Sequence, residues 1–218
     1  MTGPDFRDRL ISRAESGGLT LESTLADQLE AYYRLLATWN QRINLTALDL
    51  ESLPPEAVDR LFVEPLAAAR FAERGRQVLD VGSGGGSPAI PFALAAGVHA
   101  LTMVESRSRK SVFLKEAARV TGLANTTVMT ARFEGVAQDL AERFDIVTIR
   151  AVRILEDDWP RLARPLNAAG SLFFLHRAHL AEPVAPGLVL SATRHLTATA
   201  DLTVFKRGDV PRGTISAA

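Results

Sequence analysis

The stretch Val78-Leu79-Asp80-Val81-Gly82-Ser83-Gly84-Gly85-Gly86 joins a short apolar run to a cluster of glycines. The residues that follow, 90–96, are almost all apolar and read as a helix. A strand, a glycine loop and a helix in this order form the first turn of a parallel α/β sheet, where ligands bind at the carboxyl ends of the strands. Glycine accepts positive φ and lets a ligand approach the backbone closely. The stretch therefore predicts an α/β fold with a ligand-binding loop at residues 82–86.

Strands and helices alternate on the carboxyl side of this loop. Alternation of this kind predicts right-handed crossovers and a parallel sheet that is covered on both faces. Two final strand-like runs have no clear helix between them, which indicates an antiparallel hairpin at one edge. That edge is typical of the Rossmann-like sheet of class I methyltransferases rather than of dinucleotide dehydrogenases. The expected strands are residues 100–104, 127–129, 146–149 (entered through Phe144-Asp145), 172–175, 188–196 and 202–205. The expected helices are residues 109–120 and 159–166, the latter closed by Gly170.

The first part of the chain reads as helical. Apolar residues from Leu25 to Trp39 recur at spacings of three and four, which places them on one helix face, and Asn40 is a suitable stop. Pro54-Pro55 can open a second helix that runs through Leu66, and Gly75 breaks the pattern. We expect an N-terminal helical cap at residues 1–72, a ligand-binding domain at 73–207 and a loose tail at 208–218.

An acidic residue lies at or just after three of the expected strands. A carboxylate at Asp80 suits the cationic amino-acid end of S-adenosylmethionine better than a pyrophosphate. Glu105 ends the second strand, where a carboxylate can accept both hydroxyls of a ribose. Phe133 and Glu134 follow the third strand and can pack on an adenine and accept its amino group. Taken alone, Phe133 also fits a core position and Glu134 a solvated surface, but the three strand ends converge on one crevice.

Composition excludes several classes of protein. The chain has 218 residues and no cysteine, so disulfides, a thiol nucleophile and cysteine-ligated zinc are excluded. No apolar run approaches 18 residues, and the first ten residues lack the apolar core of a secretory signal, so we expect a cytoplasmic protein without a membrane partner. Residues 1–72 hold 7 basic and 11 acidic residues, and residues 73–218 hold 18 and 14. An arginine-rich second part is compatible with RNA and equally with an ordinary solvated surface.

A set of stretches in order between about residues 20 and 175 resembles the RsmG (GidB) family of 16S rRNA guanine-N7 methyltransferases. The ordered set is far more specific than any one member. The matching stretches are Tyr33-Arg34-Leu35-Leu36, Trp39-Asn40, Ile43-Asn44-Leu45-Thr46, the glycine loop with Pro88-Ala89-Ile90-Pro91, Glu105-Ser106-Arg107, Arg109-Lys110, Phe113-Leu114, Arg132-Phe133-Glu134, Phe144-Asp145 and Arg150-Ala151.

The resemblance implies binding of S-adenosylmethionine and methylation of a guanine N7 in the small ribosomal subunit. The cofactor contacts that it implies are Gly82, Ser87, Glu105, Phe133, Glu134 and Arg150, to which we add Asp80, Gly84 and Ser106 from the same strand ends. The chain departs from the family at Leu61, where the family has histidine, and at His176, where it has lysine.

Guanine N7 has an in-plane lone pair and no proton, so methyl transfer to it needs no general base, and the sequence offers none. For RNA we expect contacts from Arg107, Arg109, Lys110 and Arg153, with Arg107, Arg109 and Arg150 converging at the mouth of the crevice. We expect no metal site, because no carboxylate or thiol completes a ligand set with His176 and His179. We also expect a monomer.

Alternatives remain open. They are a diverged methyltransferase with another substrate, a catalytically silent protein that binds the cofactor or the ribosome, and an NAD(P)-binding oxidoreductase.

Overall fold

The computed structural model describes residues 3–150, 154–178 and 185–208, and its centre is a seven-stranded sheet in the order β3-β2-β1-β4-β5-β7-β6. The pairs among β1 to β5 are parallel, whereas β7 pairs antiparallel with both β5 and β6. This arrangement confirms the expected parallel sheet with an antiparallel edge hairpin. The strands are β1 (Gln77–Val81), β2 (Ala100–Glu105), β3 (Thr126–Thr130), β4 (Phe144–Arg150), β5 (Leu166–Arg177), β6 (Leu188–Thr197) and β7 (Ala200–Arg207).

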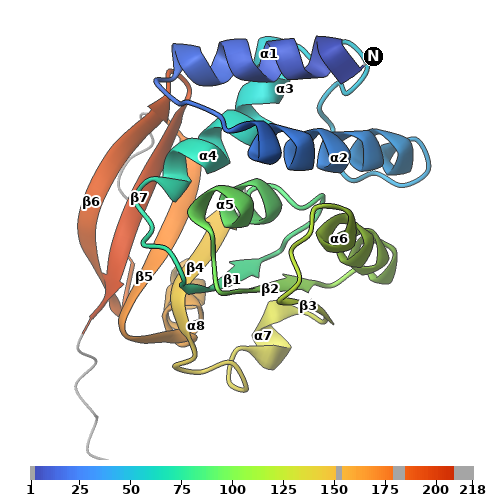
Figure 1. Ribbon diagram of the computed structural model, residues 1–218. Helices are drawn as coiled ribbons and strands as arrows, with labels where there is room; N and C mark the ends of the chain where they lie inside the picture. The colour runs from blue at the N-terminus through green and yellow to red at the C-terminus, as the bar shows by residue number, and fades with distance from the viewer. Residues whose placement is uncertain (1–2, 151–153, 179–184, 209–218) are drawn as a thin grey trace, which may run out of the picture.

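Helices cover both faces of the sheet (Figure 1). The first six α-helices and the π turn lie over one face, and α7 and α8 lie over the other. The helical segments are α1 (Gly3–Ser16), α2 (Ser23–Asn40), α3 (Pro55–Val58), the π turn η1 (Asp59–Val63), α4 (Glu64–Ala69), α5 (Ala89–Ala96), α6 (Ser108–Val120), α7 (Phe133–Val136), the 3-10 turn η2 (Glu156–Asp158) and α8 (Trp159–Ala163).

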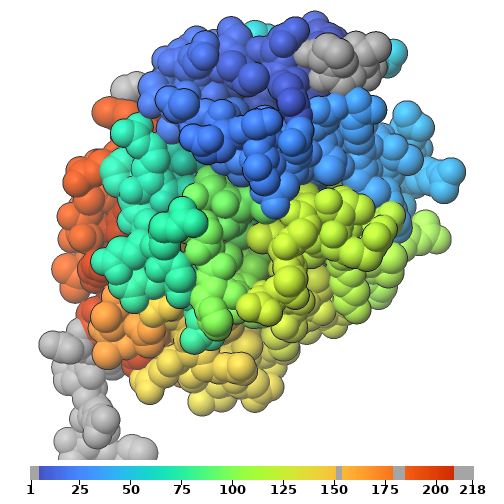
Figure 2. All heavy atoms as spheres, viewed as in Figure 1, coloured from blue at the N-terminus to red at the C-terminus, as the bar shows by residue number. Residues whose placement is uncertain are grey.

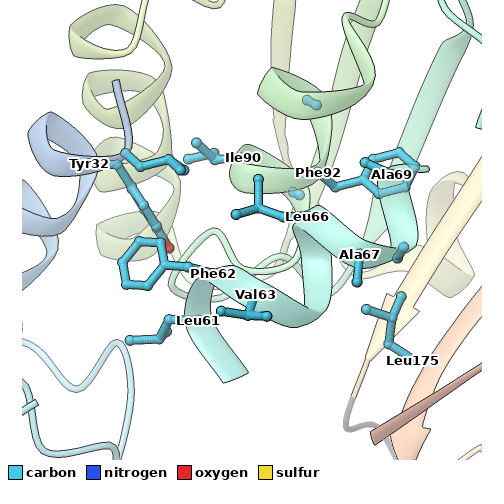
Figure 3. Packing of buried hydrophobic residues seen from close by; sticks show 14 of the residues in the cluster. Tyr32, Leu61, Phe62, Val63, Leu66, Ala67, Ala69, Ile90, Phe92 and Leu175 are labelled. Atoms are coloured by element: carbon cyan, nitrogen blue, oxygen red, sulfur yellow. The ribbon is translucent and has the colours of Figure 1, made fainter. Parts of the chain in front are cut away.

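The N-terminal helices share one hydrophobic core with the sheet. Phe62 of η1 has no exposed surface, and its ring lies 5.3 Å from that of Phe6 and 6.0 Å from that of Tyr32. The same cluster continues through Leu66 and Phe92 to Leu175 on β5 (Figure 3). Figure 2 shows the blue atoms of α2 lying directly on the green and yellow-green atoms of α5 and α6, and α1 packs on α2. A boundary at residue 72 stays a prediction, and the shared core crosses it.

Helix α1 was not expected as an element. Its buried residues, Phe6, Leu10 and Ala14, are spaced by four and form a narrow stripe on a helix that is otherwise polar. So short a stripe gives a weak periodic signal, although packing against α2, α3 and η1 fixes the helix.

The region around Gly170 differs from the expectation. Helix α8 ends at Ala163, and Leu166 already opens β5, paired with Phe144 of β4. The pairing shifts register between Phe144 and Ile146, so Gly170 lies at an irregularity inside a strand and does not close a helix. A Cβ at Gly170 would approach Leu166 Cβ to 3.0 Å, which explains the glycine.

The second predicted helix contains a π turn just before Pro65, and two carbonyls of the turn lack their ordinary α-helical bonds. Pro65 has no amide hydrogen to give to the carbonyl of Leu61, four residues earlier. The amide of Glu64 donates to Asp59, five residues earlier, and so leaves the carbonyl of Arg60 free. Side chains from the sheet side bind both carbonyls: Ser87 Oγ donates to Leu61 at 2.9 Å, and Arg150 donates to Arg60.

We predict that Phe62→Ala lowers the free energy of unfolding by about 3–5 kcal/mol, because it leaves a cavity in the shared core. The matched control is Phe71→Ala, whose ring is 45% exposed and lies below Arg194; its cost should stay under about 1 kcal/mol. Denaturant unfolding followed by both fluorescence and circular dichroism should show one transition in each variant. A separate early transition of the helical part in Phe62→Ala would contradict a common core.

Candidate functional site

The loop after β1 needs glycine at three positions. Gly82, Gly84 and Gly86 have φ values of 73°, 52° and 87°, which L side chains rarely adopt. A Cβ at Gly86 would lie 2.8 Å from Ile90 Cδ1, so this glycine allows close packing of α5. A Cβ at Gly84 would meet only the carbonyl of Gly82 at 3.7 Å and would otherwise project into open space. The backbone at Gly84 is therefore accessible to a ligand.

The same loop is held from the side of the N-terminal helices. The hydroxyl of Tyr32 donates to the carbonyl of Gly85 at 2.5 Å, and burial raises the pKa of Tyr32, so this donor keeps its proton. The Leu45 carbonyl lies 3.0 Å from the position that a Cβ on Gly85 would take, which excludes any larger residue there. Asn40 Oδ1 accepts from the amides of Leu45 and Thr46 and so fixes the segment that makes this contact.

Asp80 is buried at the end of β1, with 1% of its surface exposed. Its Oδ1 accepts a 2.6 Å hydrogen bond from Thr148 on β4, whereas Oδ2 makes none. Burial raises the pKa of Asp80, and the hydrogen bond from Thr148 opposes that shift. A buried carboxylate oxygen without a partner can accept a hydrogen bond from a ligand or from a water beside one.

Glu105 connects the glycine loop to the start of α6. It is 7% exposed, and its two carboxylate oxygens accept from the amides of Gly84 at 2.9 Å and Arg107 at 2.7 Å. Each oxygen has a second lone pair that can accept a hydroxyl. Glu105 thus combines a structural role in the loop with free acceptor capacity beside it.

Two cavities meet at Gly82. The first has a volume of about 240 Å³ and is lined by Val81, Gly82, Val104, Glu105, Ser106, Ala131, Arg132, Phe133 and Glu134. It brings together the residues that the sequence predicts for a ribose and an adenine. The second has a volume of about 360 Å³ and lies between the glycine loop and the N-terminal helices. Its lining is Leu36, Leu45, Thr46, Leu48, Arg60, Leu61, Gly82, Ser83, Gly84, Gly85, Ser87, Lys110 and Arg150.

The Arg150 side chain is buried at the end of β4, whereas Arg107 and Arg109, which are predicted to converge with it at the mouth of the crevice, are exposed. Arg150 Nη2 lies 3.3 Å from Glu64 Oε2, and Nη1 donates to Ser87 Oγ at 3.2 Å as well as to the Arg60 carbonyl. Burial lowers the pKa of Arg150 to about 10 despite the Glu64 carboxylate, whose own pKa burial raises.

The sequence did not single out Glu64, because its partner lies 86 positions away. Neither Arg150 Nε nor Nη2 makes a hydrogen bond, and because Nη2 faces Glu64, Nε is the donor of the guanidinium without a partner.

The predicted RNA contacts lie at different depths. Arg107 and Arg109 are exposed at the start of α6, whereas Lys110 is half-buried and lines the second cavity. Arg153 lies outside the described residues. Of the two departures from the family pattern, Leu61 lines the second cavity. His176 Nε2 lies 2.8 Å from Thr203 Oγ1, and its ring stacks on Phe174.

Within the described residues, no group of three or more histidine, aspartate or glutamate side chains has the placement to hold a metal ion. No helix of the described chain has the length and apolar character to cross a membrane.

Comparison with known proteins gives the same family from sequence. The model of the family described as "rRNA small subunit methyltransferase G" (GidB) matches residues 25–185. Among curated relatives, the ribosomal RNA small subunit methyltransferase G of Stutzerimonas stutzeri is 39% identical over 157 residues, which cover 71% of each chain. The protein of the same name from Laribacter hongkongensis is 38% identical over 168 residues, which cover 76% of this chain and 77% of the relative.

Solved structures agree on the fold alone. A SAM-dependent methyltransferase from Aquifex aeolicus superposes with a TM-score of 0.55 at 12% identity, covering 69% of this chain and 92% of that one. A ribosomal protein L11 methylase from Lactobacillus delbrueckii superposes with a TM-score of 0.52 at 18% identity, covering 67% and 77%. The glycine loop, the two cavities and the sheet order agree with this family. The match over residues 25–185 shows that the chain belongs to the rRNA small subunit methyltransferase G family.

Proposed function

We propose that this protein transfers the methyl group of S-adenosylmethionine to N7 of a guanine in small-subunit rRNA. The observation that carries the proposal is the family match across residues 25–185, which spans both cavities around Gly82. The two linings share Gly82, so an acceptor in one cavity and a methyl donor in the other would face each other at that glycine. We further propose that the protein acts on ribosomal subunits in the cytoplasm, and that it acts as a monomer.

The residues around the first cavity fit the adenosine part of the cofactor. Glu105 would accept the ribose hydroxyls, and Phe133 and Glu134, at the start of α7, would contact the adenine. The backbone of Gly82 and Gly84 would lie against the amino-acid part, with Ser106 at the rim. In a NAD-binding site, a pyrophosphate would have to lie beside the unpartnered Oδ2 of buried Asp80, which would repel it.

Asp80, buried at the end of β1 before the glycine loop, and Arg150, which lines the second cavity, would offer opposite charges to the amino-acid part of the cofactor. Asp80 Oδ2 has no hydrogen-bond partner and would accept from the ammonium group, and Arg150 Nε has none and would donate to the carboxylate. Ser87 holds Arg150 Nη1 and so orients the guanidinium. Ser87 therefore acts as a positioning residue in this proposal.

The reaction needs alignment rather than proton transfer. When bound, S-adenosylmethionine supplies a methyl group that the N7 lone pair takes as the carbon–sulfur bond breaks and its electrons return to sulfur. The aliphatic wall of Leu36, Leu45 and Leu61 would exclude water and hold the base in line. Correct placement of two reactants can contribute roughly 7–11 kcal/mol to lowering the barrier. The absence of a histidine or unpaired carboxylate from the lining of the second cavity is consistent with this chemistry.

We predict that S-adenosylmethionine or its demethylated product raises the melting temperature at saturation, because a ligand that binds only the folded state stabilises it. The measurement is thermal unfolding with each ligand and with NAD. A shift with NAD and none with S-adenosylmethionine would overturn the proposed cofactor.

We predict that Gly84→Val weakens cofactor binding at least tenfold, or about 1.4 kcal/mol, because the side chain would fill the open space beside the loop. Gly18→Val is a matched control, because Gly18 also has positive φ (69°) and no neighbour within 4 Å of an added Cβ. Gly18 lines neither cavity. Both variants should lose about 1–2 kcal/mol of stability to backbone strain. Calorimetric titration that finds equal cofactor affinity in the two variants would show that the cofactor lies elsewhere.

We predict that Arg109→Ala weakens binding to small ribosomal subunits and lowers the slope of log affinity against log salt by about 0.7–0.9, as expected for one lost phosphate contact. Cofactor affinity should not change, since Arg109 is exposed and lines neither cavity. The control is Arg161→Ala, an exposed arginine on α8 at the opposite face of the sheet. Identical salt slopes for the two variants would remove the start of α6 from the RNA-binding surface.

A further inference from the structure

The second cavity has a polar feature that the cofactor does not account for. Arg60 and Lys110 reach it from different elements, the π turn η1 and helix α6, and each is half-buried. Neither side chain takes part in any hydrogen bond or ion pair found among the described residues. By contrast, Arg7, Arg9, Arg13 and Arg34 on the surface helices all have carboxylate partners. We call Arg60 and Lys110 the cation pair.

The π turn fixes where Arg60 stands. Its backbone carbonyl receives Arg150, and the next carbonyl, of Leu61, receives Ser87. Both bonds attach the backbone of the turn to the sheet and the glycine loop. The side chains of Arg60 and Leu61 line the cavity beside those anchors. The anchored backbone therefore fixes the point from which the Arg60 side chain enters the cavity.

The local charge is unbalanced. Glu64 is the buried carboxylate nearest to Arg150, at 3.3 Å, and it also feels the positive charge of Arg60, so one anion serves two cations. Burial has the largest effect on the pKa of Arg150 and lowers it, whereas the Glu64 carboxylate raises it. The positive charge of Arg60 lowers the same pKa further. Partly desolvated cations are costly unless an anion compensates them. The cavity therefore favours an anionic ligand in addition to any group bound by Arg150.

The rest of the lining indicates which anion. Leu36, Leu45, Leu48 and Leu61 form an apolar wall, and the glycine loop forms the opposite side. A nucleotide that has left the base stack has both features that this cavity would complement, a flat apolar base and a phosphate. The carboxylate of an amino acid lacks the first feature.

We propose that the cation pair binds a phosphate of the target nucleotide, which enters the second cavity extruded from the RNA with its base against the leucine wall. This inference rests on the proposed function. It adds Arg60 to the RNA contacts that the sequence predicts. Arg150 and the cation pair then have separate ligands: the cofactor for Arg150 and the RNA for Arg60 and Lys110.

The test compares Arg60→Gln, Lys110→Gln and the double variant with the parent protein, and uses Arg161→Gln on α8 as the control. The substrate is small ribosomal subunits that lack the methyl group, with tritiated S-adenosylmethionine. Each single variant should lower kcat/KM for the particle at least tenfold. Each should also lower the salt slope of particle binding by about 0.7–0.9. Calorimetric cofactor affinity should stay within twofold of the parent. Arg60→Lys keeps the charge and should recover part of the activity.

The outcomes separate the inference from the proposed function. If the parent labels no rRNA, the proposed function fails first. If the parent is active and Arg60→Gln matches it, the cation pair does not bind the target. A loss of cofactor affinity in Arg60→Gln would assign Arg60 to the cofactor carboxylate and also overturn the inference. If Arg60→Gln melts early, the test uses Arg60→Lys, which should melt at the parent's temperature, combined with Lys110→Gln. This combined variant must show the reduced salt slope of Lys110→Gln, and a slope equal to the parent's would overturn the inference.

Discussion

The carbonyl groups of Arg60 and Leu61 cannot be satisfied within their own helix. Pro65 has no amide hydrogen for one, and the five-residue bond from Glu64 to Asp59 bypasses the other. A buried carbonyl without a partner is costly, so the chain must supply donors from elsewhere. They come from Ser87, just after the glycine loop, and from Arg150, at the end of β4. These two contacts connect the helical N-terminal part to the sheet at the point where the cavities lie.

Several features of the site follow from that connection. Arg150 can occupy a buried position because Glu64 of the next helix supplies a negative charge. Tyr32 and Leu45 close over Gly85, so the second cavity has a wall contributed by the N-terminal helices and a floor contributed by the glycine loop. The site is therefore incomplete in either half alone, in keeping with the single hydrophobic core that crosses residue 72. The N-terminal segment is part of the binding machinery as well as a cover.

The sequence predicted the periodic parts of this arrangement well. The strands around the glycine loop and the edge hairpin have buried, β-prone runs with clear turns, and acids at successive strand ends converge by topology alone. What it did not predict depends on distant partners or on exceptions to helix geometry. The sequence predicts Arg150 at the site but not its burial, because Glu64, the carboxylate beside it, lies 86 positions away in the sequence. Pro65 gave a local signal for a distorted helix, but the direction in which the free carbonyls point, and hence the role of Arg60, required the fold.

The central claim is that the two cavities bring a methyl donor and a guanine N7 together. A guanine methylated at N7 is positively charged, so borohydride can reduce its imidazole ring and aniline then cleaves the strand at that nucleotide. The decisive measurement is this cleavage on 16S rRNA from small subunits that lack the modification, after incubation with the protein and S-adenosylmethionine. The account predicts one new cleavage site, at a guanine, that requires both protein and cofactor. Methyl label in rRNA without cleavage, or label only in ribosomal protein, would contradict it.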